Sequence, residues 1–161
     1  MLLNADDVET LSAGAAKSPA ALFRAIEDVA TRRVDAGLVT MMRHDAVEST
    51  VARLHSSNRQ AYPVGGKKVK RDTAWGRKVL TEHRVLVSAG DEGLRESFDD
   101  YATIIGLGLH SCVNVPLVSD GKCIGTMNIS RAQAAWNDDE IALVRALGLA
   151  ALAGVLMVIK A

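Results

Sequence analysis

The sequence predicts an α+β fold in which helices cover both faces of a central antiparallel sheet. Two pairs of strand-like segments, residues 37–57 and 111–129, are each joined by a short polar stretch, as in β-hairpins. Segments with helical periodicity separate and flank these pairs. Hairpins pair their strands antiparallel, and amphipathic helices bury their apolar faces on a sheet, so a layered arrangement follows.

Four segments are predicted to be helical, and the best-defined one follows Ser18 and Pro19. Serine is a good N-cap, and proline at the first helical position loses no hydrogen bond that the helix needs. The predicted helices span residues 19–33, 73–82, 91–108 and 137–159. Residues 1–17 show no clear periodicity and are treated as an extension, frayed or helical, before one domain of residues 18–161.

Strands are predicted over residues 37–44, 49–57, 84–89, 111–119 and 122–129. The second of these alternates apolar and polar residues, which is typical of a strand with one buried face. The segment Tyr62–Asp72 is predicted to be a loop, because Pro63, Gly65 and Gly66 break both the strand and the helix periodicity.

The last two strands contain both cysteines, and their register decides what the thiols can do. Asp120 and Gly121 are a strong signal for a two-residue turn, because both central positions of a type I′ turn need positive φ. The predicted cross-strand pairs are Ser119–Lys122, Val118–Cys123, Pro116–Gly125 and Cys112–Ile129. The two thiols then lie roughly 20 Å apart, against at most ~7 Å between the Cα atoms of a disulfide. We therefore expect neither a disulfide nor a shared metal site.

The same register predicts which side chains share a face of the hairpin. One face is expected to carry Asn114, Pro116, Gly125 and Met127. The other is expected to carry Val113, Val115, Leu117, Ile124, Thr126 and Asn128. Asparagine amides in a central hairpin must find hydrogen-bond partners, either in the neighbouring backbone or in a ligand.

Composition argues against several classes of function. Lys plus Arg and Asp plus Glu both number 19, so no global basic field attracts nucleic acid or an anionic membrane. Two cysteines and an acidic N-terminal segment do not match a small secreted domain, and we expect a cytoplasmic protein. The apolar run 146–159 is shorter than the ~20 residues of a membrane span, so it is expected to pack in the core or against a partner.

Several motifs together resemble the GAF domain family. They are YPVGGKKVKRDTAWG, ESFDDYATIIGLGLHS, CVNVPLVSDGKCIGTMNI and WNDDE, which are spread over residues 18–159. The resemblance implies a central antiparallel sheet like that of PAS domains, with a small-molecule pocket on one face and the terminal helices on the other. It also implies a homodimer through the helices Pro19–Arg33 and Glu140–Ile159.

The motifs of three functional branches of that family are not matched. Members that bind cyclic nucleotides carry Asn-Lys, Phe and Asp-Glu, whereas here Ser130 stands where lysine is needed and Trp136 replaces phenylalanine. Free methionine-R-sulfoxide reductases need a cysteine before the hairpin, and bilin attachment needs an accessible loop cysteine. Residues 72–98 contain none. We therefore predict no catalysis and no cofactor.

Four residues are candidate ligand contacts, at the hairpin and the helix that precedes it: Tyr101, His110, Asn114 and Asn128. Tyr101 and Trp75 lie on apolar helical faces, and both could line a pocket, although core packing is the default explanation of each. The four histidines show no metal-ligand spacing. The basic run Lys67–Arg71 is either an anion site or a solvated charged face.

The sequence thus predicts a sensory module that binds a small molecule and signals through a separate partner protein. Ordering of the helix 91–108 by the ligand would pass the signal to the dimer helices. Two alternatives stay open. One is an enzyme like the sulfoxide reductases, and the other is a dimerisation scaffold whose pocket is packed solid by Trp75, Phe98 and Tyr101.

Overall fold

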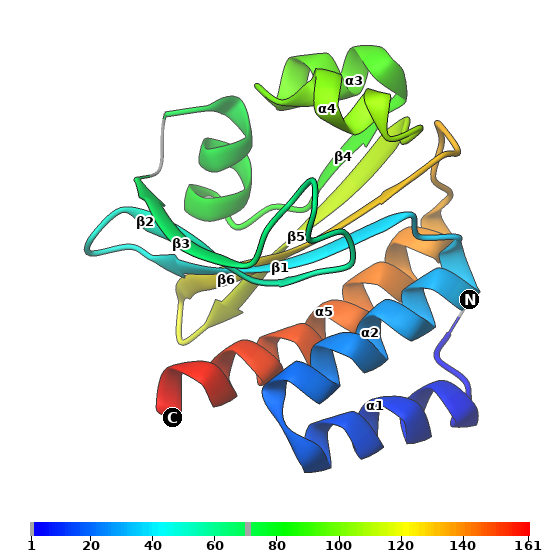
Figure 1. Ribbon diagram of the computed structural model, residues 1–161, viewed down its shortest axis with the longest axis vertical. Coiled ribbons are helices and arrows are strands. Elements are labelled where there is room, and N and C mark those ends of the chain that lie inside the picture. Colours follow the sequence, from blue (N-terminus) through cyan, green and yellow to red (C-terminus); the bar gives the residue numbers. More distant parts are fainter. Residues whose placement is uncertain (1, 70–71) are drawn as a thin grey trace.

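The computed structural model describes residues 2–69 and 72–161 and has a six-stranded antiparallel sheet between two layers of helices (Figure 1). The strand order is β3-β2-β1-β6-β5-β4. The strands are β1 (Leu38–Asp45), β2 (Thr50–Ser56), β3 (Gly65–Val69), β4 (Leu86–Ala89), β5 (Ser111–Ser119) and β6 (Lys122–Arg131). The predicted α+β architecture is confirmed, and the N- and C-terminal helices pack together on one face.

Two helices cover the first face of the sheet, α2 (Pro19–Val34) and α5 (Asp138–Lys160), and α1 (Ala5–Lys17) lies on the outer side of α2 (Figure 1). The side chains of Ser18 and Asn137 cap α2 and α5, as polar N-cap residues do by accepting bonds from free backbone N–H groups. The extension before residue 18 is helical and packs on α2. The main apolar core lies between α2, α5 and the sheet, where Ile26, Met127 and Leu147 are fully buried.

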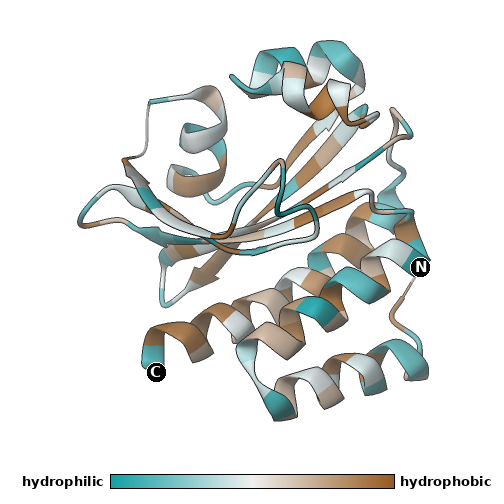
Figure 2. Ribbon diagram, viewed as in Figure 1, coloured by the Kyte–Doolittle hydropathy of each residue, from teal (hydrophilic) through white to brown (hydrophobic). Residues whose placement is uncertain are grey.

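Helix α5 is hydrophobic along most of its length (Figure 2). By length and composition it is the one helix in the described ranges that could cross a membrane. Its inner side, however, is buried against α2 and the sheet, as the core helix of a globular domain is.

The second face carries the π-helix η1 (Gly76–Thr81) and the short helices α3 (Gly90–Ser97) and α4 (Tyr101–Gly106). The prediction of one helix over 91–108 was wrong, because the chain becomes extended at Phe98. The hydroxyl of Ser97 donates to Gly93 O and accepts from Ser88 Oγ, which ties the end of α3 to β4. This break between α3 and α4 places residues 98–100 at the sheet.

The predicted loop Tyr62–Asp72 also contains an element that periodicity did not indicate. Residues Gly65–Val69 form β3, an edge strand paired with β2. Both glycines adopt positive φ, which turns the chain into the strand. Of the basic run, Lys70 and Arg71 lie outside the described residues.

The hairpin turn is confirmed, but part of the predicted register was wrong. Ser119 pairs with Lys122, and Val118 pairs with Cys123, as expected. A β-bulge then adds one residue to β6, so that the pairs beyond it include Leu117–Gly125, Pro116–Thr126, Asn114–Asn128 and Cys112–Ser130. Cys112 and Cys123 still lie at opposite ends of the hairpin, and both are buried thiols that form no disulfide with each other.

The bulge also corrects the predicted faces, because a shift of one residue exchanges the two faces of a strand. Thr126 and Asn128 share a face with Asn114 rather than with Val113. Only this shift brings the apolar rows of both strands together on the helical core. Gly125 has a further reason to be glycine, because a Cβ there would lie 2.3 Å from the carbonyl oxygen of Met42 on β1.

Candidate functional site

A cavity of about 280 Å³ lies on the second face of the sheet, below the layer of η1, α3 and α4. Its floor consists of alternate residues from the central strands, and its walls come from β2, the segment before η1 and the break between α3 and α4. The walls include the aromatic side chains of Tyr62, Trp75 and Phe98. Phe98 stands at the break between α3 and α4, and its side chain lines the cavity.

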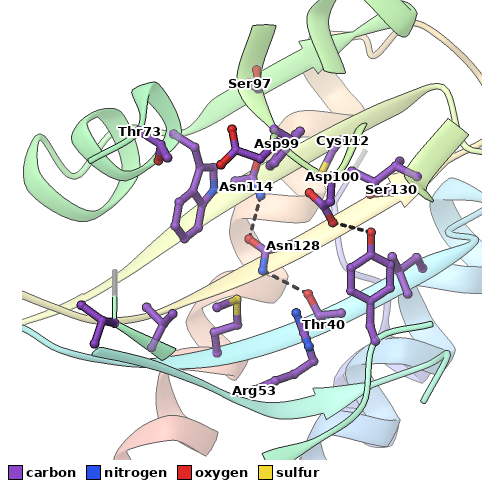
Figure 3. Close-up of a pocket in the computed structure, with 18 residues that line it drawn as sticks. Thr40, Arg53, Thr73, Ser97, Asp99, Asp100, Cys112, Asn114, Asn128 and Ser130 are labelled. Carbon is purple, nitrogen blue, oxygen red and sulfur yellow. Dashed lines mark hydrogen bonds between the residues drawn. The ribbon is translucent and has the colours of Figure 1, made fainter. Parts of the chain in front are cut away.

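A chain of side-chain amides and hydroxyls crosses the floor (Figure 3). Asn114 Nδ2 on β5 donates to Asn128 Oδ1 on β6 at 2.7 Å. Asn128 Nδ2 in turn donates to Thr40 Oγ1 on β1 at 3.1 Å and to Thr126 Oγ1 at 3.2 Å. The orientation of the Asn114 amide is thus fixed by bonds that link three neighbouring strands.

Three polar atoms of the cavity residues have no hydrogen-bond partner among the described residues: Asn114 Oδ1, Arg53 Nε and Trp75 Nε1. Five buried side-chain atoms in the described ranges have this property, so the cavity holds the majority of them. Asn114 is only 2% exposed. An unpaired buried polar atom costs about 1–3 kcal/mol, and a cluster of them around one cavity indicates a place where another molecule completes the bonds.

Charged groups gather toward the mouth of the cavity. Asp100, which is exposed, accepts a bond from Tyr62 Oη at 2.7 Å. The guanidinium of Arg53 lies 5.1 Å from the centre of the Tyr62 ring, and its Nη1 donates to Pro63 O. Burial and, second, the bond to Asp100 raise the pKa of Tyr62 well above its usual range. The phenol therefore stays protonated and donates to the carboxylate.

Cys112 is the thiol that lines the cavity. It is buried beside Ser130, its cross-strand partner, and burial raises the pKa of its thiol to about 12. Because the thiolate is the reactive form, this group is a poor nucleophile at neutral pH. Cys123 is buried near the hairpin turn, with its thiol 3.2 Å from Gly125 O.

The structure brings together two of the four predicted contact residues. Asn114 and Asn128 line the cavity, and their amides are bonded to each other. Tyr101 does not line the cavity. Its ring packs against a small apolar cluster that includes Leu94 and Leu109, and the guanidinium of Arg95 lies over the ring. His110 is also outside, with Nδ1 2.5 Å from Asp91 Oδ1.

Sequence reasoning missed Arg53, Thr40 and the role of Trp75. Arg53 lies two residues after Val51 on the same strand, so both side chains point to the same face. An arginine on a partly buried face indicates a possible polar contact. For Trp75 the sequence left core packing as the default and a place in a pocket as the alternative, and its position in the lining and the missing partner of its indole N–H favour the second.

The acidic residues at the start of α5 have a structural role. Glu140 forms a capping box with Asn137 and accepts two bonds from the buried Arg131, both at 2.8 Å. The guanidinium also stacks 3.8 Å from the centre of the Trp136 ring. These contacts give Trp136, Asn137 and Glu140 of the WNDDE segment a structural role. The described residues include no cluster of His, Cys, Asp and Glu that could hold a metal ion.

Comparisons with known proteins agree with this architecture. The family model of the GAF domain matches residues 18–155. The GAF domain of a sensor histidine kinase from Bacillus halodurans is 17% identical and superimposes with a TM-score of 0.68, covering 84% of this chain and 91% of that one. The GAF domain of a phosphoenolpyruvate-protein phosphotransferase from Coxiella burnetii is 12% identical, with a TM-score of 0.74 and coverages of 94% and 91%.

A domain of a methyl-accepting chemotaxis protein is 16% identical to this chain, with a TM-score of 0.67 and coverages of 91% and 94%. No curated protein sequence matches the chain. At these identities the structural likeness establishes the fold.

Proposed function

Because this chain belongs to the GAF domain family, whose members are sensory modules of signalling proteins, we propose that it binds a small molecule in the cavity on the second face of its sheet. Asn114 and Asn128 are the proposed floor contacts, and Trp75 and Arg53 the proposed wall contacts. Tyr101 and His110 stay predictions, and their positions outside the lining argue for an indirect role.

One observation carries this proposal: the cavity combines apolar walls with buried polar atoms that lack partners among the described residues. Ligand sites have this character, in which a few placed polar groups on an apolar surface fix the orientation of the ligand. A scaffold with a filled pocket would instead have Trp75, Phe98 and Tyr101 packed solidly together. Trp75 and Phe98 line an open space, which favours the sensory function.

We further propose that the module has no catalytic activity. The sulfoxide reductase alternative needs a reactive thiol and a second cysteine within reach. The thiol of Cys112 has a raised pKa, and Cys123 lies at the far end of the hairpin. Both properties support a binding role over a redox role.

We also propose a homodimer through the terminal helices, with α5 rather than α2 as the main contact surface. Helix α1 covers one side of α2, and the exposed positions of α2 include the charged Arg24 and Asp28. Between the exposed Arg145 and Lys160, the outer side of α5 is apolar, with Leu149 71% exposed. A cytoplasmic module of this kind would signal to a separate partner protein.

The test is a thermal-shift screen of the whole chain against a broad set of metabolites, in parallel with the variant Asn114→Leu. Because a ligand that binds only the folded state raises the melting temperature, a ligand should stabilise the wild type but not the variant. A screen in which no compound stabilises the wild type would refute the ligand role.

A further inference from the structure

We propose that the cavity takes a small uncharged heterocycle with an amide-like edge, that is, a ring in which an N–H donor lies beside a carbonyl acceptor. This inference rests on the proposed function and names the chemical class of its ligand. Three observations carry it: the volume of the cavity, the kind of polar atoms that lack partners, and the position of the charges.

The volume limits the enclosed part of a ligand to one or two rings. A water molecule occupies about 30 Å³ of liquid, so a cavity of about 280 Å³ has room for roughly nine waters or a similar number of non-hydrogen atoms. A pyrimidine or purine base fits this space whole. A nucleotide or a tetrapyrrole would have to extend out of the cavity.

The unpaired atoms are one acceptor and two donors. Asn114 Oδ1 needs a hydrogen-bond donor from the ligand, and the bond from its Nδ2 to Asn128 holds the amide in this orientation. Trp75 Nε1 and Arg53 Nε need acceptors. An amide edge offers a donor and an acceptor side by side, and it satisfies both kinds of atom with a single ring.

The charges disfavour an anionic ligand. The described residues of the lining include one cation, Arg53, and two carboxylates, Asp99 and Asp100, which are both exposed. Arg53 already donates to Pro63 O and stacks on a tyrosine. An entering phosphate or carboxylate would meet the carboxylate of Asp100 and then lose its hydration over a floor of neutral amides, hydroxyls and a thiol.

The walls suit a flat ring. Trp75 and Phe98 are aromatic, and Ile104, Met42 and Val51 add aliphatic surface. Burying a planar apolar ring between such side chains supplies affinity, while the amide edge supplies orientation.

The experiment titrates the full chain with matched probes and measures each dissociation constant by calorimetry. Uracil and hypoxanthine carry the amide edge on one and on two rings. In 1,3-dimethyluracil the N–H donors are blocked, and orotate adds a carboxylate to the uracil ring. We expect uracil or hypoxanthine, or both, to bind. The dissociation constants of dimethyluracil and orotate should be at least about tenfold higher.

Three variants locate the site. Asn114→Leu and Trp75→Phe each remove one of the unpaired atoms, and each should weaken the amide probe about tenfold. Trp136→Phe removes an indole N–H that donates to Ser111 Oγ outside the cavity, and it should leave the affinity unchanged. Trp75→Phe keeps an aromatic ring in place, so it tests the claim even where Asn114→Leu fails to fold.

Three results would overturn this inference: no binding of uracil or hypoxanthine, equal binding of dimethyluracil or orotate, or unchanged affinity in Trp75→Phe. Its failure differs from that of the proposed function. If orotate or another anion binds and Asn114→Leu abolishes that binding, the sensory role stands and the ligand class is wrong. If neither the probes nor the metabolite screen give binding, both are wrong.

Discussion

The two faces of the sheet are covered in different ways. On the first face, α2 and α5 seal an apolar core in which side chains such as Ile26, Met127 and Leu147 have no exposed surface. On the second face, Asn114 and Asn128 stand in the middle of the sheet, and the short helices above leave a cavity. The same two strands, β5 and β6, supply both surfaces through their alternating side chains.

This difference separates what stabilises the fold from what recognises a ligand. The apolar face gains free energy from burial, in proportion to the area removed from water. The polar face retains unpaired buried atoms, which lower stability and are typical of sites where function opposes folding. Substitutions on the two faces should therefore change the stability of the fold by different amounts. The largest expected change comes first.

Truncation of the apolar face should cost the most. Leu147→Ala on α5 removes a fully buried side chain and should lower the free energy of unfolding by about 2–5 kcal/mol. Leu149→Ala, two residues along the same helix and 71% exposed, should change it by less than ~0.5 kcal/mol in the monomer. Denaturant unfolding measures both. Similar losses would show that α5 does not pack as described.

The ion pair beside the first face should give a pH-dependent effect. The bonds from Arg131 hold the pKa of Glu140 below its usual value of 4.5. Because the folded-state pKa is the lower one, this stabilisation is complete above the unfolded value and is lost as the pH falls through the folded value. Glu140→Gln should lower stability at pH 7 by about 1–3 kcal/mol, since it leaves Arg131 with a weaker partner.

Measurements of unfolding from pH 7 down to acid check this prediction. The wild type should lose stability more steeply than Glu140→Gln once the pH falls below 4.5, the ordinary pKa of a glutamate side chain. Parallel curves for the two proteins would mean that Glu140 does not carry this part of the pH dependence.

The two tryptophans compare the faces directly. Trp136→Phe loses the bond from Nε1 to Ser111 Oγ at 2.8 Å, which should cost about 1 kcal/mol. Trp75→Phe loses no bond among the described residues, and it should cost less than ~0.5 kcal/mol. Thermal unfolding without ligand gives both values. A larger loss for Trp75→Phe would indicate that its indole N–H is bonded within the protein.

The smallest expected effect concerns the two cysteines, which should not react with an alkylating reagent in the folded protein. Cys112 and Cys123 are buried, and the raised pKa of Cys112 keeps its thiol protonated, so iodoacetamide should label neither in the folded protein at neutral pH. Both should react after unfolding. Rapid labelling of Cys112 in the folded state, followed by mass spectrometry, would revive the redox alternative.

The hairpin shows how far the sequence could predict this structure. Local chemistry at Asp120 and Gly121 identified the turn and the first two pairs, because a type I′ turn depends on those two residues alone. The bulge depends on contacts from elsewhere, namely the helical core and the close approach of Met42 on β1. Matching the apolar rows of the two strands would have revealed it.

The candidate site was only half predictable for a similar reason. Asn114 and Asn128 are notable in any sequence reading, because polar amides in a central hairpin need partners. Tyr101 was placed by assuming one helix, but the chain becomes extended at Phe98, and Tyr101 packs beside the cavity without lining it. Arg53 stands on a strand that the sequence does predict, but its approach to Trp75 and Asn114 across the sheet depends on the strand order, which no local pattern specifies.

The most direct test of the central claim, that the cavity is a ligand site, is a two-dimensional NMR spectrum of the indole N–H groups. The chain has two tryptophans, so it gives two such signals. Each compound that raises the melting temperature should shift the signal of Trp75, which lines the cavity. The signal of Trp136, whose indole is bonded to Ser111 outside the cavity, should stay in place as an internal control. A shift of Trp136 alone, or of neither signal, would contradict the account.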